Sequence, residues 1–389
     1  MRLSQRALGI GESATMAVSR RAAALRAEGV EVADFSAGEP DFPTPSMVVA
    51  EGVRALRAGM TRYAPTPGLP ELRSELAEGY RRRHGAPWTA QQVIVGVGAK
   101  SPLFGLSLAL LDPGHEMILP SPCWVSFPEQ VRFAGGVPVS VGTRAEEAFR
   151  IRAEPLIAAM GPATRAVLVN SPCNPTGGVM AAEDLEILAA ACAERGIVLI
   201  SDETYSHLVF EGEHASAATL AASYPETIVV VSSFSKIFAM TGWRVGYAAG
   251  PPALIKALIS IQSHSTSGPA TFAMAAALTA LREAGEEADA MRDEYRRRRD
   301  LVLELLAAIP GVECVPPAGS FYAFPRVDRH YREDRQGSVE LAEYLLEEAR
   351  VAVVPGLAFG EDNYIRLSFA CSRDTLREGL GRMARALSS

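Results

Sequence analysis

The sequence lacks the marks of a membrane protein, a secreted disulfide-bonded protein and a zinc protein. It has no stretch of about 18 apolar residues, and segment 1–13 has no apolar core long enough for a signal peptide. Its five cysteines are an odd number and include no Cys-x-x-Cys pair. This pattern is typical of a reducing compartment, so we expect a cytoplasmic protein with neither disulfides nor a bound metal.

The sequence also lacks an excess of positive charge. The net charge is −7, with 48% apolar and 21% charged residues, which is an ordinary globular composition. The basic runs 80–84 and 295–299 lie in helical patterns beside Glu75, Glu78 and Glu294, which favours solvated helix faces. We therefore expect no nucleic-acid partner and no membrane-surface partner.

The nucleotide-binding fingerprints are incomplete. Segment 98–101 resembles a phosphate loop, but Ala99 separates the glycine from Lys100, and Val95 stands where another glycine is needed. The dinucleotide pattern fails as well, because Ser101 replaces its third glycine. These departures argue against a nucleotide hydrolase and against a dinucleotide-binding enzyme.

What the sequence does have, from residue 92 onward, is short β-rich runs separated mostly by helix-length segments. This alternation predicts an α/β fold with a mostly parallel central sheet flanked by helices. We expect its strands at 93–95, 116–119, 137–141, 166–169, 197–200, 227–231 and 245–248. Helices are expected at 16–28, 46–58, 69–84, 254–263, 271–281 and 283–308.

The C-terminal part has a different pattern, in which shorter strands alternate with helices. Such an arrangement is typical of an α+β domain. Its strands are expected at 312–315, 321–324, 351–353 and 364–369, and one more at 32–35. We therefore divide the chain into an N-terminal arm (1–45) packing with the small domain, a large α/β domain (46–290) and a small C-terminal α+β domain (291–389).

Lys236 stands out because it follows a strand that should be buried. The β-branched run 229–231 leads through serines to this lysine, which has apolar neighbours such as Phe238 and Met240. Desolvation disfavours the charged amine and lowers its pKa, so Lys236 is a candidate nucleophile for a Schiff base. The alternative is that Lys236 extends along the surface to reach water.

A phosphate site is indicated near the same lysine. Ser233 and Arg244 offer donors that suit a phosphate monoester, and segment 96–101 leads into a helix whose free N–H groups do the same. An aldehyde-binding lysine next to a phosphate site describes pyridoxal phosphate. The alternative for Arg244 is an ion pair with a carboxylate.

These residues belong to a longer series of motifs that resembles the class I aminotransferases of pyridoxal-phosphate fold type I, and most closely the bacterial aspartate aminotransferase subgroup. The match runs nearly end to end and in order. It rests on Gly38-Glu-Pro-Asp41, Tyr63, Gly98-Ala-Lys100, Trp124, Asn174-Pro-Thr-Gly177, Asp202-Glu-x-Tyr205, Ser233-Phe-Ser-Lys236, Gly242-x-Arg244-x-Gly246-Tyr247 and Arg366. The resemblance implies a large α/β domain, a small domain built from both termini and a homodimer with shared active sites.

The resemblance also implies roles toward pyridoxal 5′-phosphate. Lys236 holds the cofactor as a Schiff base, and Asp202 keeps its ring nitrogen protonated. Asn174 and Tyr205 bind the ring hydroxyl oxygen, and Trp124 stacks on the ring. The phosphate is held by Ser233, Arg244, the Ala99 and Lys100 backbone and Tyr63 of the partner subunit. Without the resemblance, Asp202 reads as a helix cap, Asn174 and Tyr205 as turn residues, and Trp124 as core.

Substrate residues follow from the same resemblance. Arg366 binds the substrate α-carboxylate, and Gly38, Trp124 and Asn174 lie beside it. The alternative for Arg366 is a surface salt bridge. Ser13, Thr15 and Lys100 match a site for a second carboxylate. We therefore expect transamination between aspartate, or another dicarboxylic amino acid, and a 2-oxo acid such as 2-oxoglutarate. It follows a ping-pong sequence in which the freed Lys236 amine is the base.

Other activities stay open because the sequence departs from the family pattern. Ser101-Pro102, Gly105 and Cys173 replace more usual residues near the expected pocket. The alternatives are a prephenate or specialised biosynthetic aminotransferase and a pyridoxal-phosphate-dependent β-lyase. A non-catalytic ligand-sensing relative is the alternative from another class, and retention of the acid, base and carboxylate-binding residues argues against it.

Overall fold

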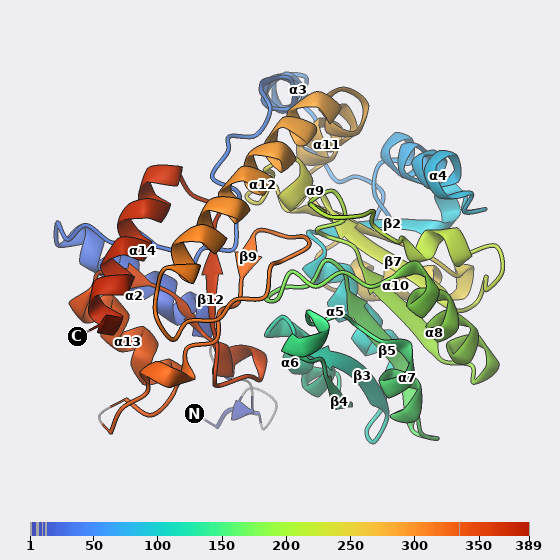
Figure 1. Cartoon of the computed structure of the whole chain (residues 1–389). Helices are drawn as coiled ribbons and strands as arrows, with labels where there is room; N and C mark the ends of the chain where they lie inside the picture. The colour runs from blue at the N-terminus through green and yellow to red at the C-terminus, as the bar shows by residue number, and fades with distance from the viewer. Residues whose placement is uncertain (1, 5–7, 10, 12–13, 334, 389) are drawn as a thin grey trace.

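The computed structural model describes residues 2–4, 8–9, 11, 14–333 and 335–388. Its largest sheet has seven strands in the order β2-β8-β7-β6-β5-β3-β4 (Figure 1). Strands β3 to β7 run parallel, whereas β8 pairs antiparallel with both β2 and β7. The strands are β2 Val93–Val97, β3 Glu116–Ser121, β4 Val137–Gly142, β5 Thr164–Asn170, β6 Val198–Asp202, β7 Ile228–Ser233 and β8 Val245–Ala249. The predicted α/β fold with a mostly parallel sheet is confirmed.

Helices cover both faces of this sheet because its strands are apolar on both sides. All six residues of β7 are buried. Val229 and Val231 belong to the apolar cluster formed with α5, α6 and α10, whereas Val230 belongs to the cluster formed with α4, α8 and α11. The helices beside the sheet are α3 Ser46–Arg57, α4 Pro70–His84, α5 Lys100–Leu110, α6 Ser126–Phe133, α7 Ala153–Ala158, α8 Ala182–Glu194, α10 Pro252–Ser263 and α11 Thr271–Glu283.

The C-terminal part forms a second apolar core beside the large sheet (Figure 1). Its antiparallel sheet has the order β11-β12-β9, and β1 of the N-terminal segment pairs parallel with β10. The strands are β1 Ala33–Asp34, β9 Tyr322–Ala323, β10 Val351–Ala352, β11 Val354–Pro355 and β12 Ile365–Ser368. Its helices are α2 Ala14–Ala27, α13 Ser338–Glu348 and α14 Arg373–Ser388, and the long helix α12 Gly285–Ala307 packs on α11 and on α14. The domain boundaries at 45 and 290 stay a prediction.

One strand expected from the sequence is not formed. The strand at 312–315 is absent from the described chain, where Glu313 forms a single bridge with Arg326. The next residues, Pro316 and Pro317, have no N–H group to continue a ladder.

None of the helices in the described ranges is long and apolar enough to cross a bilayer.

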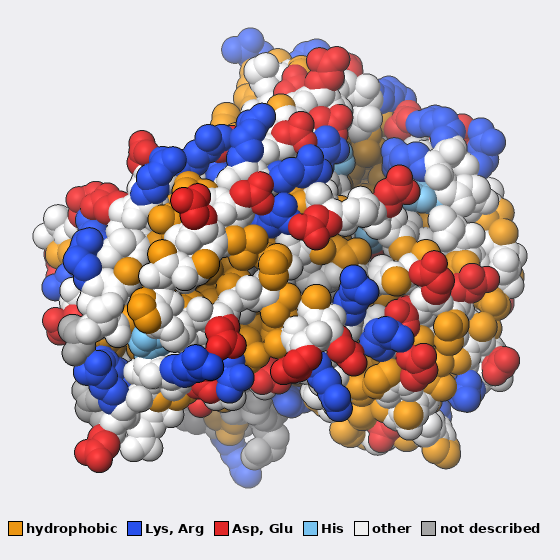
Figure 2. Space-filling view, in the orientation of Figure 1, with side chains coloured by type: hydrophobic (Ala, Val, Ile, Leu, Met, Phe, Trp, Pro, Cys, Tyr) orange, Lys and Arg blue, Asp and Glu red, His pale blue; other side chains and the backbone are white. Residues whose placement is uncertain are grey.

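The basic runs differ from each other. Run 80–84 lies as predicted on a solvated face, with Arg81 and Arg82 exposed and paired with Glu78 and Glu75. In run 295–299, however, Arg298 and Arg299 are buried, and Arg298 pairs with Asp41 as well as Glu294. The pattern of the helix does not reveal this burial, because it arises from packing against distant segments. On the face shown in Figure 2, acidic and basic side chains are interspersed along the exposed side of the molecule.

Candidate active site

The carboxyl ends of β5, β6 and β7 meet at one edge of the large sheet. Because β8 runs in the opposite direction, the residue before it, Arg244, lies at this edge too. Ser233 at the end of β7 is paired with Gly246 of β8. The reversal of β8 therefore brings Arg244 beside Ser233. The sequence predicted that these two residues lie together, but not that β8 is antiparallel.

A cavity of about 640 Å³ opens at this edge, where open α/β sheets bind their ligands. It is lined by the ends of these strands, by the N-terminal segment and by two residues of the C-terminal part. Most of the predicted site residues line it: Gly38, Ala99, Lys100, Trp124, Asn174, Asp202, Tyr205, Ser233, Lys236, Arg244 and Arg366.

Lys236 lies on the short helix α9 (Phe234–Ile237) directly after β7, and its side chain is only partly exposed. Its Nζ donates a hydrogen bond to the Gly38 carbonyl oxygen and lies 5.7 Å from the centre of the Phe321 ring. Burial lowers the pKa of Lys236 to about 8, and the positive charge of Arg366 acts in the same direction. The amine is therefore close to the protonation balance that a nucleophile or general base needs near neutral pH.

Asp202 ends β6 and faces the cavity from a buried position. One carboxylate oxygen accepts a hydrogen bond from the Thr204 amide at 3.1 Å. Burial raises the pKa of Asp202 to about 6, because the carboxylate has lost water without gaining a paired cation. A cation placed in the cavity beside Asp202 would restore the ionised form. The neighbouring Tyr205 donates to or accepts from the hydroxyl of Tyr322 at 3.0 Å.

Arg366, on β12, is 2% exposed and has no carboxylate partner among the described residues. Its Nη1 donates to Asn174 Oδ1 at 3.0 Å and its Nη2 to the Ser36 carbonyl oxygen at 2.8 Å. The guanidinium lies over the ring of Tyr322, 4.3 Å from its centre, and within the part of the chain that the structure describes its Nε has no hydrogen-bond partner. A buried cation without an anion is costly, so this arrangement favours binding of an anionic ligand in the cavity.

Another part of the cavity wall, formed by Ser233, Arg244 and the start of α5, suits a phosphate. Gly98, in the left-handed region at φ +66°, precedes α5 and donates its amide to the Arg244 carbonyl oxygen at 3.0 Å. A Cβ at Gly98 would lie 2.5 Å from Arg244 Nη2, so only glycine leaves room for this guanidinium. Ser233, Arg244 and the first amides of α5 thus supply hydroxyl, cationic and N–H donors at a helix N-terminus.

The chain is similar in sequence to a known protein family along most of its length. Residues 30–383 match the family model described as aminotransferase class I and II. The chain belongs to this family. It is 48% identical to the aspartate/prephenate aminotransferase of Thermus thermophilus, over 99% of this chain and 98% of that protein. It is 43% identical to the probable aspartate/prephenate aminotransferase of Aquifex aeolicus, over 99% and 98%.

Solved structures agree with this assignment. The aspartate aminotransferase from Thermus thermophilus with maleate has a TM-score of 0.94 and 48% identity, covering 99% of this chain and 100% of that chain. The aspartate aminotransferase from Rhizobium meliloti has a TM-score of 0.94 and 38% identity, covering 100% and 99%. The protein is thus an aminotransferase enzyme, and its sheet and flanking helices are those of fold type I.

The roles of three predicted site residues are not tested by this cavity. Tyr63 of the aminotransferase is 98% exposed, and its predicted role requires a second subunit. Ser13 lies outside the described residues, and Thr15 lies on α2, where its side chain is not described. Their roles stay predictions.

Sequence reasoning missed other residues of the aminotransferase cavity. Tyr322 contacts both Tyr205 and Arg366, but its strand carries no recognisable motif. Glu39 accepts a hydrogen bond from the Thr241 hydroxyl at 2.9 Å and lines the cavity. Its place inside the Gly38-Glu-Pro-Asp41 motif is the sequence signal that points to it. Among the described residues, no group of three His, Cys, Asp or Glu side chains has a metal-binding arrangement.

The lowered pKa of Lys236 predicts how its amine reacts with pH. Only the unprotonated amine reacts with acetic anhydride. In the cofactor-free protein, the rate at which Lys236 is labelled should therefore rise with pH and reach half its plateau near pH 8. The chain has three lysines, Lys100, Lys236 and Lys256, so each labelled peptide can be resolved by mass spectrometry. Exposed Lys256 on α10 is the internal reference for reagent activity. Labelling of Lys236 that still increases tenfold per pH unit above pH 9 would contradict the burial argument.

Proposed function

We propose that this aminotransferase uses pyridoxal 5′-phosphate to exchange the amino group of aspartate, or another dicarboxylic amino acid, with 2-oxoglutarate or a similar 2-oxo acid. The observation that carries the proposal is a cavity with a deprotonatable lysine, a buried carboxylate and an unpaired buried arginine on its walls. Lys236, Asp202 and Arg366 provide these three groups.

The residues present fit the cofactor. Asp202 forms no ion pair with any described residue, and a protonated ring nitrogen would provide a cation. Ser233, Arg244 and the amides of Ala99 and Lys100 would hold the phosphate. Trp124 would cover the ring, while Asn174 and Tyr205 would bind its hydroxyl oxygen. When bound, the cofactor supplies an aldehyde for the amino group and a ring that accepts the electrons of the substrate Cα–H bond.

The protein side chains then bind the substrate and move one proton. Arg366 binds the substrate α-carboxylate with its free donor positions, which orients the Cα–H bond toward the amine of Lys236. With the cofactor bound, Lys236 would take the Cα proton and deliver it to the carbon that carried the aldehyde, because its pKa of about 8 lets the amine both accept and donate. In the second half-reaction the amine would move a proton in the opposite direction, to the Cα of the amino acid formed from the second oxo acid, which gives a ping-pong sequence.

The dicarboxylate preference rests on the relatives and on Lys100. Lys100 lines the cavity, and its Nζ lies 4.8 Å from the centre of the Trp124 ring. We infer that it binds the second carboxylate, with Ser13 and Thr15 as further candidates. The Thermus relative is named for aspartate and prephenate and was solved with maleate, so prephenate, another dicarboxylate, is the second candidate acceptor.

We also propose that the active enzyme is a homodimer. Tyr63 lies on the exposed loop before α4, and 98% of its surface is accessible in the single chain. An aromatic residue exposed to this extent is typical of an interface residue. On this proposal, Tyr63 of the partner subunit donates its hydroxyl to the phosphate near Arg244.

The visible absorption spectrum of the purified protein tests the proposal. L-Aspartate should remove the visible band of the bound cofactor, and 2-oxoglutarate should restore it. L-Alanine, the matched substrate without the second carboxylate, should react about 10 to 100 times less efficiently, since a charged hydrogen bond contributes about 1.5–3 kcal/mol. A band that no amino acid changes would contradict the activity, and equal rates with alanine would contradict the dicarboxylate preference. Failure to bind added pyridoxal phosphate would contradict the cofactor.

A further inference from the structure

Glu203 is a buried carboxylate directly after Asp202, and its role is not explained by the cavity chemistry. It is 3% exposed, and among the described residues it is not part of the cavity lining. The Glu203 amide donates to the Val231 carbonyl oxygen at 2.8 Å, so the strand pairing of β6 continues through it. Since successive side chains along a strand point to opposite faces, Asp202 faces the cavity and Glu203 faces away from it.

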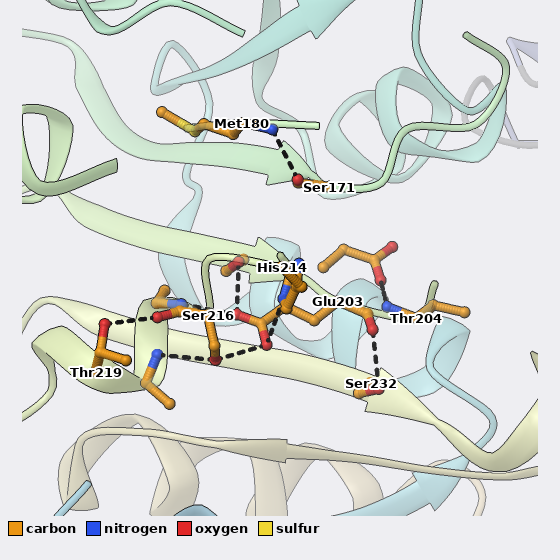
Figure 3. Close-up of polar contacts among 12 residues, drawn as sticks. Ser171, Met180, Glu203, Thr204, His214, Ser216, Thr219 and Ser232 are labelled. Atoms are coloured by element: carbon orange, nitrogen blue, oxygen red, sulfur yellow. Dashed lines mark hydrogen bonds and ion pairs between the residues drawn. The ribbon is translucent and has the colours of Figure 1, made fainter. Parts of the chain in front are cut away.

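Both oxygens of the Glu203 carboxylate are occupied (Figure 3). Oε1 accepts hydrogen bonds from the Ser201 hydroxyl at 3.0 Å and from the Ala217 amide at 2.9 Å. Oε2 accepts from the Ser216 hydroxyl at 2.8 Å and lies 3.2 Å from His214 Nε2. Burial acts to raise the pKa of Glu203, but these contacts outweigh it and hold the pKa below its ordinary value. The carboxylate therefore ties the end of β6 to segment 214–217.

The Asp202 side chain, by contrast, depends on the main chain for its direction. Among the described residues, one hydrogen-bond donor reaches its carboxylate, the Thr204 amide. The main chain on either side is well held: the Asp202 carbonyl oxygen accepts from Asn170 Nδ2 at 3.1 Å, and the Glu203 carbonyl oxygen accepts from the Ser232 hydroxyl at 3.3 Å. The Glu203 side chain adds further contacts on the face opposite the cavity, with Ser201, Ser216 and Ala217.

We propose that Glu203 is a positioning residue whose contacts with Ser201, Ser216 and Ala217 fix the direction in which Asp202 points into the cofactor cavity. The inference rests on the proposed function, in which Asp202 pairs with the ring nitrogen of pyridoxal phosphate. Removing the carboxylate would leave a buried amide and two hydroxyls without their acceptor, and the chain around residues 201–217 would relax to satisfy them. The Asp202 carboxylate would then no longer point in the direction needed to pair with the ring nitrogen, although its own side chain is intact.

A double-mutant cycle on cofactor affinity separates positioning from general stability. Pyridoxal phosphate is titrated into the cofactor-free protein and binding is followed by absorbance. Glu203→Ala should weaken cofactor binding by about tenfold or more. This is the lower end of the affinity loss that follows when a residue that orients a metal-binding side chain is replaced. Glu203→Gln should stay within about threefold of wild type, since its carbonyl oxygen still accepts from Ser201 and Ala217. In the Asp202→Ala background, Glu203→Ala should change affinity by less than about twofold, because the residue it positions is gone.

Controls make each outcome decisive. Thr219 belongs to the same loop and donates to the Ser216 carbonyl oxygen at 2.8 Å, so Thr219→Ala should leave the cofactor affinity unchanged. If Glu203→Ala does not fold, Ser216→Ala replaces it, with a loss of about threefold that again disappears without Asp202. Equal losses with and without Asp202, or no loss with Asp202 present, would overturn the positioning role and leave the proposed function intact. An unaffected Asp202→Ala variant would instead contradict the proposed role of Asp202.

Discussion

Replacement of Lys236 with alanine should reduce the transamination rate by at least about 10⁴-fold, because one side chain supplies both the covalent attachment and the base. No other lysine of the chain is placed to substitute for it. Lys100 also lines the cavity, but its Nζ lies over the Trp124 ring, and Lys256 is exposed on α10. The amine that forms a hydrogen bond with the Gly38 carbonyl is therefore the one expected to act at the substrate carbon.

The rate is measured as 2-oxo acid formed from L-aspartate in the presence of 2-oxoglutarate. Lys236→Arg keeps a positive charge but is neither a nucleophile nor a base at neutral pH, so it should be as inactive as Lys236→Ala. Lys256→Ala is the matched control and should retain the wild-type rate. Retention of more than one per cent of the activity by Lys236→Ala would remove the lysine from the mechanism.

The sequence predicted those features that depend on local pattern. Segment 229–231 read as a buried strand because its residues are apolar on both sides, and β7 is buried throughout. Lys236 follows directly after this strand, so its low exposure could be expected from its neighbours alone. Likewise, the expected helices at 46–58 and 69–84 correspond to α3 and α4 within a residue or so at each end.

Features that depend on pairing between distant segments were not predictable in the same way. The reversal of β8 is set by its two neighbours in space, because its own residues suit either direction. The pairing of Arg298 with Asp41 joins residues 257 positions apart, so a helical pattern that suggests solvation says nothing about it. Tyr322 contacts Tyr205 across 117 positions of the chain. The contacts of Glu203 with segment 214–217 also required the fold, because turns place that segment behind the strand.

Replacement of Arg366 with methionine should lower kcat/KM for aspartate by about 10²- to 10³-fold, mainly through a higher KM. Loss of one partner from a buried charge pair costs about 2–5 kcal/mol, and each 1.4 kcal/mol corresponds to a factor of ten. The same change should not lower the thermal unfolding midpoint of the cofactor-free protein. Arg366 is buried, and no carboxylate of the described residues pairs with it, so an apolar side chain of similar length removes a desolvation cost while losing the contacts with Asn174 and Ser36.

A lower kcat/KM with an unchanged or higher unfolding midpoint would show that Arg366 serves ligand binding. Replacement of an arginine that supports the fold should lower both kcat/KM and the midpoint. Arg335 is the matched control: it is also buried, packs 3.8 Å from the centre of the Tyr344 ring and does not line the cavity. Arg335→Met should leave kcat/KM of the folded enzyme unchanged, because Arg335 does not line the cavity. If Arg366→Met instead destabilises the protein and keeps kcat/KM within threefold of wild type, the guanidinium supports the fold and another group must bind the substrate α-carboxylate.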